Sequence, residues 1–186
     1  MRKIVIVAGV ATLLAGCGDK GDIETAINKT ISKEPVCYSF NSKQNNSAAY
    51  YRFSEAGVLV RVNVRGNDVG PILAGLKKSG LIDIEYEQQL SGPVAVLSAT
   101  DKGVKAKFWD QEHGACVGKR VVAEIKEWTE PGNSDSQKVT QVSYTWKLSD
   151  VPGWVDKEAF SSVKGMSEPE EARIVLVKTN NGWTAM

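Results

Sequence analysis

Apolar and polar residues alternate without interruption from Gln141 to Leu148, and this run constrains the fold more than any other part of the chain. Successive side chains of a β-strand point to opposite faces, so such alternation is typical of a strand with one buried face. The predicted inner residues are Val142, Tyr144, Trp146 and Leu148, and the predicted outer residues are Gln141, Ser143, Thr145 and Lys147. The chain is therefore expected to contain an antiparallel sheet that covers a core on one side.

The segment before this run is predicted to be its hairpin partner. Residues 119–128 (KRVVAEIKEW) place Val121, Ala123 and Ile125 on one face. The turn-rich loop TEPGNSDSQ then leads into the alternating run, which predicts an antiparallel pair.

After the alternating run, residues 153–163 are expected to form a short helix or an ordered crossover. Residues 172–179 (ARIVLVKT) are apolar on both faces, which is typical of a central or covered strand. In outline, a meander that ends in a strand and a Gly-Trp pair is similar to the sheets of cystatin-like and nuclear-transport-factor-2-like proteins.

The N-terminal half begins with a predicted helix. Asp22 is a candidate N-cap, and Pro35 is expected to end the helix near Glu34. The apolar stripe of this helix consists of Ile23, Ala26, Ile27, Thr30 and Ile31. An Asn-rich loop over residues 41–48 and a strand over residues 58–64 follow.

A second helix is expected to begin between Asp68 and Pro71 and to stop at Gly80. Two β-like runs follow it, at residues 81–88 and 94–100, separated by QLSGP. This order predicts a helix followed by a hairpin.

Residues 71–103 resemble the recognition helix and wing of winged-helix proteins, which read as a leucine-rich helix, a Gly-Leu-Ile exit, a hairpin and Thr-x-x-Gly. That family commonly binds nucleic acid. Here the 23 basic and 22 acidic residues nearly balance, and Lys77 and Lys78 form the only adjacent basic pair nearby. We therefore expect a reused scaffold without a nucleic-acid partner.

Together these patterns predict an α+β fold, with N-terminal helices packed with a small hairpin, followed by a C-terminal antiparallel β-meander. The expected units are a helix-rich lobe with a wing-like hairpin over residues 22–110 and an antiparallel sheet lobe over residues 111–186. One continuous domain is the alternative, since the 170 residues from Cys17 to Met186 suit a single domain.

The N-terminus reads as the leader of a bacterial lipoprotein. Arg2 and Lys3 precede an uncharged, mostly apolar segment from Ile4 to Gly16, which is too short to span a bilayer but suits a signal peptide. The last four residues of the pattern, Leu14, Ala15, Gly16 and Cys17, resemble a lipobox. In a lipobox the small residues admit the signal peptidase and the cysteine thiol accepts a diacylglyceryl group. The alternative is an ordinary secretory signal that contains a cysteine.

The resemblance implies that residues 1–16 are a removed signal peptide and that residues 17–21 form a lipid-anchored N-terminus, with acyl chains such as palmitate on Cys17. Each buried methylene contributes about 0.8 kcal/mol, so more than one chain gives stable attachment. By resemblance to the enterobacterial sorting pattern, Gly18 favours the outer membrane, facing the periplasm. Asp19 one place later leaves the inner membrane as an alternative.

Cys37 and Cys116 remain once Cys17 carries lipid, and an even pair outside the cytoplasm predicts a disulfide. Two buried free thiols are the alternative. No metal or other cofactor is expected, because His113 and Cys116 have no further ligands at a suitable spacing.

The sequence contains only incomplete matches to known catalytic motifs. Ser161 and Lys164 match Ser-x-x-Lys, but the sequences at Lys178 (KTN) and Ser134 (SDS) are not the partner motifs of penicillin-binding proteins. The acids that could form a glycosidase pair are Asp101, Asp110, Glu112 and Glu124. His113 is the only histidine and reads as a loop residue without an orienting carboxylate, so we expect it to be exposed and non-catalytic.

Trp128, Trp154 and Trp183 lie at predicted strand ends or turns, where an aromatic ring either covers the core or offers an apolar surface to a partner. They are the candidate partner-binding residues. The preferred function is a non-enzymatic, lipid-anchored binding module that binds another envelope protein or a cell-wall component. The alternative is a small-ligand binder or minor periplasmic hydrolase with a pocket between helix and sheet.

Overall fold

The structure is a computed structural model, and it describes residues 16–39, 52–66, 68–134 and 137–186. The predicted leader up to residue 15 and the predicted Asn-rich loop at 41–48 lie outside the described residues. Strands make up 48% of the structure and helices 18%. The prediction of an α+β fold with N-terminal helices packed with a hairpin is therefore wrong, and the protein is mostly β.

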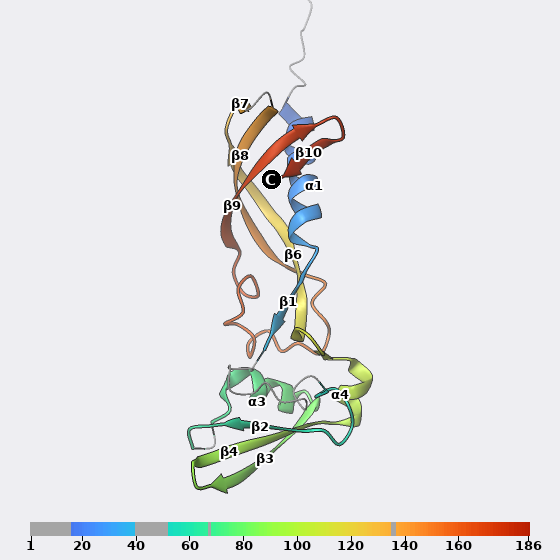
Figure 1. Cartoon of the computed structure of the whole chain (residues 1–186), viewed down its shortest axis with the longest axis vertical. Coiled ribbons are helices and arrows are strands. Elements are labelled where there is room, and N and C mark those ends of the chain that lie inside the picture. Colours follow the sequence, from blue (N-terminus) through green and yellow to red (C-terminus); the bar gives the residue numbers. More distant parts are fainter. Residues whose placement is uncertain (1–15, 40–51, 67, 135–136) are drawn as a thin grey trace, which may run out of the picture.

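The larger sheet curls around helix α1 (Gly16–Ile31) as an antiparallel half-barrel, shown in the upper part of Figure 1. Its strand order is β1-β6-β8-β9-β10, with β5 paired to β6 and β7 paired to β8. The strands are β1 (Pro35–Tyr38), β5 (Trp109–Asp110), β6 (Gly114–Trp128), β7 (Gly132–Ser134), β8 (Gln137–Ser149), β9 (Glu170–Thr179) and β10 (Gly182–Ala185). We call this sheet together with α1 the sheet lobe.

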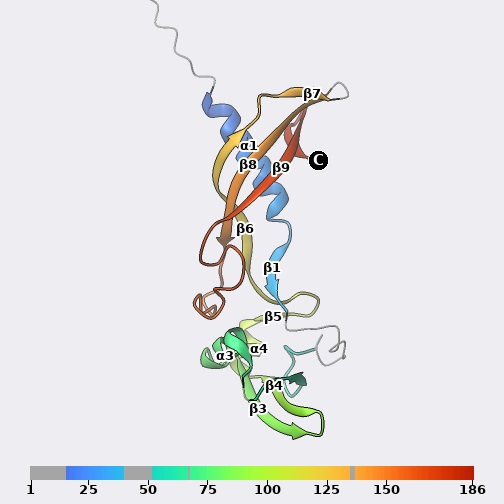
Figure 2. The same ribbon diagram turned by 90° about the vertical axis from the view of Figure 1, so that its left-hand side faces the viewer.

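A smaller antiparallel sheet lies at the other end of the long axis (Figures 1 and 2). Its strand order is β2-β4-β3, and two short helices accompany it. The elements of this hairpin lobe are β2 (Leu59–Asn63), α3 (Gly70–Lys78), β3 (Ile82–Gln89), β4 (Gly92–Ala99) and α4 (Asp101–Ala106). The predicted order of helix and hairpin is confirmed, and Gly80 follows α3 with a φ of 69°, a conformation that favours glycine.

Helix α1 packs on the sheet lobe and not with the hairpin. Ile23, Ala26 and Ile27 are buried in its predicted stripe. The strand residues of this core are Val122, Ile125, Val142, Tyr144, Leu176 and Trp183. The helix begins at Gly16, so Asp22 lies inside it and is not the N-cap. An N-terminal helix thus fills the concave side of a sheet built from the opposite end of the chain.

Irregular pairing in β6 changes the predicted inner face of this strand. The register with β8 shifts at Ala123 and again at Lys126. A β-bulge adds one residue to one strand and so changes which side chains point inward. Val122 and Ile125 are buried, whereas Ala123 is exposed and Val121 is half-buried. The predicted inner face is therefore correct only at Ile125.

The inner face of β8 follows the alternation more closely. Val142, Tyr144 and Leu148 are buried as predicted, although Thr145, a predicted outer residue, is also only 9% exposed. Strand β9 is not covered on both faces, because Val175 is 40% exposed. That part of the prediction for residues 172–179 is wrong.

Residues 150–169 cross from β8 to β9 without a regular helix or strand, as one of the two predicted alternatives stated. This crossover covers α3. Ala159 packs against Gly75, at a point where no side chain could be added to the glycine. Lys78 forms an ion pair with Asp156 at 3.3 Å. One face of α3 is thus occupied by the chain itself.

Candidate functional site

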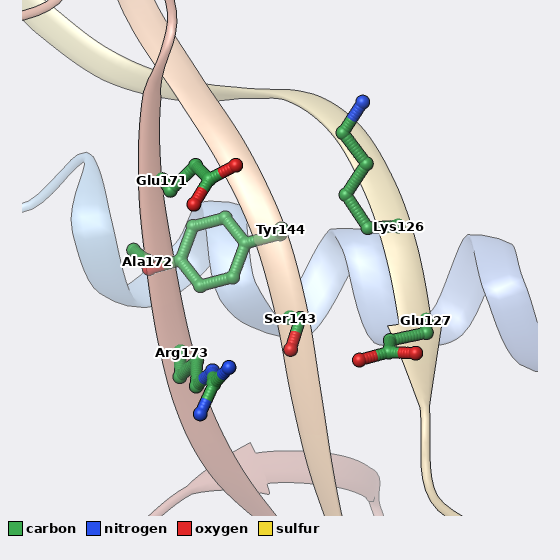
Figure 3. Close-up of a pocket in the computed structure, with 7 residues that line it drawn as sticks. All are labelled: Lys126, Glu127, Ser143, Tyr144, Glu171, Ala172 and Arg173. Carbon is green, nitrogen blue, oxygen red and sulfur yellow. The ribbon is translucent and has the colours of Figure 1, made fainter.

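The sheet lobe carries a groove across three strands, on the face away from α1 (Figure 3). The groove has a volume of about 440 Å³. Its lining residues are Lys126 and Glu127 from β6, Ser143 and Tyr144 from β8, and Glu171, Ala172 and Arg173 from β9. The helix lies behind the strands in Figure 3, and the groove shares Tyr144 and Ala172 with the core between helix and sheet.

A second hollow of about 220 Å³ continues the groove at the end of β6. It shares Glu127, Ser143 and Arg173 with the first hollow and adds Trp128, Thr129 and Gln141. The side chain of Trp128 is 37% exposed. We call the two hollows together the outer groove; it is polar along the strands and ends at an indole ring.

Hydrogen bonds hold the strand end beside Trp128 in a fixed register. The Thr129 N–H donates to the Gln141 carbonyl at 3.0 Å, and the Gln141 N–H donates to the Thr129 hydroxyl at 3.0 Å. The hydroxyl of Thr140, which is buried, donates to the Thr129 carbonyl at 2.7 Å. Because both backbone and side-chain groups are paired here, Trp128 is presented from a rigid support.

The charges of the outer groove balance, with Lys126 and Arg173 against Glu127 and Glu171. The Lys126 ammonium also lies 2.5 Å from the carboxylate of Glu124, and this hydrogen bond lowers the pKa of Glu124. Among the described residues, no ion pair engages Glu127, Glu171 or Arg173. These three side chains are therefore available to a ligand.

The chemistry of the outer groove is that of binding. Ser143 supplies a hydroxyl, and burial raises the pKa of Tyr144, which keeps its phenol neutral. His113 precedes the other end of β6, roughly 40 Å away along an extended strand. Ser143 thus has no histidine beside it, and the outer groove offers hydrogen bonds and charges to a ligand.

His113 is exposed as predicted, but the expectation that it lacks an orienting carboxylate is wrong. Its Nδ1 lies 2.8 Å from Oδ1 of Asp110. The same oxygen accepts hydrogen bonds from the backbone N–H groups of His113 at 2.8 Å and Glu112 at 2.9 Å. The bond from the His113 backbone, followed by that from its ring, lowers the pKa of Asp110. The three-residue spacing of Asp110 and His113 was the sequence signal for this turn.

The structure places the four candidate acids in three different parts of the fold. Asp101 lies in the first turn of α4, in the hairpin lobe. Asp110 and Glu112 belong to the turn at His113. Glu124 lies in β6, paired with a lysine. This arrangement does not match the facing carboxylates of a glycosidase.

The residues of the serine–lysine motif are also separated. Ser161 and Lys164 are exposed on the crossover. Lys178 lies in β9, with its ammonium 4.9 Å from the ring centroid of Trp183. The side chain of Ser134 lies outside the description. The motif therefore does not form a site with Lys178.

Among the three candidate tryptophans, Trp128 is the exposed one. Trp154 packs against Phe108 and Phe160, with ring centroids 6.2 Å and 6.0 Å apart. Trp183 is only 9% exposed. Trp154 and Trp183 thus cover core residues, which is the first of the two roles that the sequence predicts for them.

The structure joins Cys37 of β1 to Cys116 of β6, and their Cα atoms lie 3.8 Å apart across the strand pair. The predicted pair is therefore placed within bridging reach. Cys17 belongs to the first turn of α1, but its side chain is not described, so its acylation stays a prediction.

The described part of the chain contains neither a metal-binding cluster nor a membrane-spanning helix. No group of three or more histidine, cysteine or acidic side chains there could hold a metal ion. None of the helices described has the length and apolar character needed to cross a membrane.

Comparisons with protein-family models, with curated proteins and with solved structures found no match to this chain. The resemblances to lipoproteins, winged-helix proteins and cystatin-like sheets therefore stay predictions. Function has to be inferred from the residues and their geometry.

Proposed function

We propose that the protein is a lipoprotein of the bacterial cell envelope, anchored through Cys17, that acts as a non-enzymatic binding module. The outer membrane, on its periplasmic side, is the favoured location. The outer groove is the observation that carries the binding role, because Glu127, Glu171 and Arg173 project from paired strands without ion-pair partners among the described residues. Charged side chains on a rigid sheet are preorganised for a partner.

The start of α1 supports an anchor at Cys17. The helix begins at Gly16, so acyl chains on Cys17 would be attached to the helix without an intervening linker. Among the side chains of α1 that are described, from Asp19 onward, the first buried one is Ile23. Removal of a leader before Cys17 would therefore leave the packing of α1 on the sheet intact.

The anchor is tested by metabolic labelling with a clickable fatty acid. Wild-type protein should incorporate the label and fractionate with membranes, and Cys17→Ser should lose the label. Cys37→Ser is the matched control, because it removes a different cysteine and should keep the label. Label retained on the Cys17→Ser variant would show that the anchor is elsewhere.

The partner that fits the outer groove is an extended polar segment of another envelope protein or of the cell wall. Arg173 can bind a carboxylate, while Glu127 and Glu171 can bind ammonium groups. An open groove across strands admits a chain segment, whereas an enzyme of small substrates usually encloses them. The segment should therefore carry charges of both signs.

Photo-crosslinking in intact cells tests this surface. A photoreactive amino acid at Glu171 should give a discrete crosslinked product, and the same residue at Glu85, an exposed position of β3 in the hairpin lobe, is the control. Adding Arg173→Glu should remove the product, because it reverses one charge of the groove. A product from Glu85 alone, or the same product with and without Arg173→Glu, contradicts the proposal.

A second candidate, the binding of a small polar ligand, is favoured by a hollow of about 630 Å³ between α1 and the β9–β10 turn. Asp22, Lys29 and Asn181 are among its lining residues. Trp183 also lines it, and the buried Nε1 of this residue has no hydrogen-bond partner among the described residues. Addition of free amino acids or N-acetylated sugars should then shift the indole N–H resonance of Trp183, assigned with Trp183→Phe; an unmoved resonance argues against this candidate.

A further inference from the structure

We infer that the exposed indole of Trp128 is a second contact with the membrane, resting among the lipid headgroups when Cys17 is acylated. The inference rests on the proposed lipid anchor and adds to it a point at which the folded sheet lobe meets the bilayer. The occupant of this surface is a bilayer of zwitterionic phospholipid.

A hydrogen bond fixes how far along the molecule Trp128 lies. The backbone N–H of Val122 in β6 donates to the side-chain oxygen of Asn28 in α1 at 2.8 Å. From this level β6 continues to Trp128, and α1 leads back to Cys17, toward the same end of the sheet lobe (Figures 1 and 2).

Trp128 and Cys17 lie at similar distances from the hydrogen bond between Asn28 and Val122. Six strand residues at about 3.3 Å each take β6 roughly 20 Å from Val122 to Trp128. Eleven helix residues at about 1.5 Å each take α1 roughly 16 Å from Asn28 back to Cys17. The indole and the acylated cysteine therefore lie at nearly the same height, and a bilayer that receives the acyl chains also reaches Trp128.

The chemistry of Trp128 suits this position. An indole has an apolar ring and one N–H donor, and tryptophan is enriched at the membrane–water interface for this reason. Beside it on the same strand, Lys126 and Glu127 supply one charge of each sign. A zwitterionic headgroup carries a phosphate and an ammonium group, so both find a charge of opposite sign there. The remainder of the outer groove, across β8 and β9, stays open to a partner.

Fluorescence quenching tests the contact. The protein is purified from bacterial envelopes in detergent and reconstituted into phosphatidylcholine vesicles that contain phosphatidylcholine brominated close to the headgroup. Bromine quenches a tryptophan that it touches, so the wild type should be quenched and Trp128→Phe should lose most of this quenching. Trp154→Phe is the control, because it removes an indole of the crossover, which packs on Phe108 and Phe160, and should keep the quenching. Equal quenching in wild type and Trp128→Phe, or none in the wild type, overturns the inference.

Intact mass measured on the same samples separates this inference from the anchor itself. Absence of the acyl mass overturns the lipid anchor. Acylated protein without quenching at Trp128 overturns the membrane contact alone. Because the local charges balance, the quenching should persist at high salt, and its loss there would contradict a zwitterionic surface.

Discussion

Asn28 in α1 and Val122 in β6 are joined by a hydrogen bond, in which the Val122 N–H donates to the Asn28 side-chain oxygen at 2.8 Å. The bond lies directly before the register shift at Ala123, where pairing with β8 is interrupted. It therefore ties the helix to the sheet at a point where a backbone group needs a partner from outside the ladder.

Replacement of Asn28 by alanine should destabilise the sheet lobe. The substitution leaves the Val122 N–H without its acceptor in a partly buried setting, which costs about 1–3 kcal/mol. Urea unfolding should show a lower midpoint with an unchanged slope. Asn28→Asp keeps an acceptor oxygen and should lose less; equal losses in the two variants would show that the hydrogen bond is not the cause.

The disulfide between Cys37 and Cys116 should contribute strongly to stability, because it closes a loop between residues 79 positions apart. The chain-entropy model gives roughly 4–5 kcal/mol for a loop of this length. Unfolding of wild type with and without reductant, beside Cys37→Ser, measures this contribution. Alkylation under denaturing, non-reducing conditions should modify neither cysteine, and two alkylated thiols by mass would contradict the bridge.

Gly75→Ala should loosen the contact between α3 and the crossover. A Cβ at Gly75 would overlap the Cβ of Ala159. Overpacking costs about 1–3 kcal/mol, and the better helix propensity of alanine returns up to about 1 kcal/mol, so a net loss of about 1 kcal/mol is expected in thermal or urea unfolding. Adding Ala159→Gly should restore most of the loss, because it removes the overlapping carbon. A double variant less stable than Gly75→Ala would contradict this explanation.

The turn at Asp110 should open in acid. The backbone N–H and ring of His113, with the Glu112 N–H, hold the pKa of Asp110 below its ordinary value of about 3.9. A lowered folded pKa means that the stabilisation is complete above about pH 4 and is lost as the pH falls through the folded value. Amide exchange of Glu112 and His113 should therefore accelerate below pH 4, beyond its intrinsic pH dependence. Asp110→Asn keeps the acceptor oxygen and should not show this change; the same change in that variant would assign it to another group.

Replacement of Trp154 by alanine should lower the free energy of unfolding much more than the same replacement of Trp128. Trp154→Ala removes ring contacts with Phe108 and Phe160 and should cost about 3 kcal/mol. Trp128→Ala, at an exposed strand end, should change the free energy of unfolding by less than about 0.5 kcal/mol. Unfolding of both variants in urea checks this. A large loss for Trp128→Ala would show that this ring supports the fold and would undermine its use as a probe of binding.

The parts of the fold that were predictable depend on local signals. The alternation at residues 141–148 was enough to locate β8, and Gly80 was enough to locate the end of α3. The register shifts at Ala123 and Lys126 were not predictable, because a bulge is a property of two paired strands. The packing of α1 on the C-terminal sheet likewise depends on contacts between distant segments.

The outer groove was missed for a related reason. Ser143 was predicted to be an outer residue, and Glu127 and Arg173 belong to no motif. The three become neighbours only through the registers of β6 with β8 and of β8 with β9. Trp128 was found because an aromatic residue at a strand end is visible in the sequence. The sequence did not show that Trp128 is exposed while Trp154 and Trp183 are largely covered; this became visible only in the structure.

Strand β6 runs through the whole sheet lobe, from Gly114 beside the hairpin lobe to Trp128 at the far end. Fifteen residues of extended strand measure roughly 50 Å. With an anchor at Cys17, the length of this strand fixes the distance between the β3–β4 turn and the bilayer. Adding or removing two residues in β6 and in β8 would change the length of the sheet lobe and move that turn by about 7 Å, while leaving the hairpin lobe unchanged. The length of one strand pair thus decides how deep into the space beyond the membrane the molecule can reach.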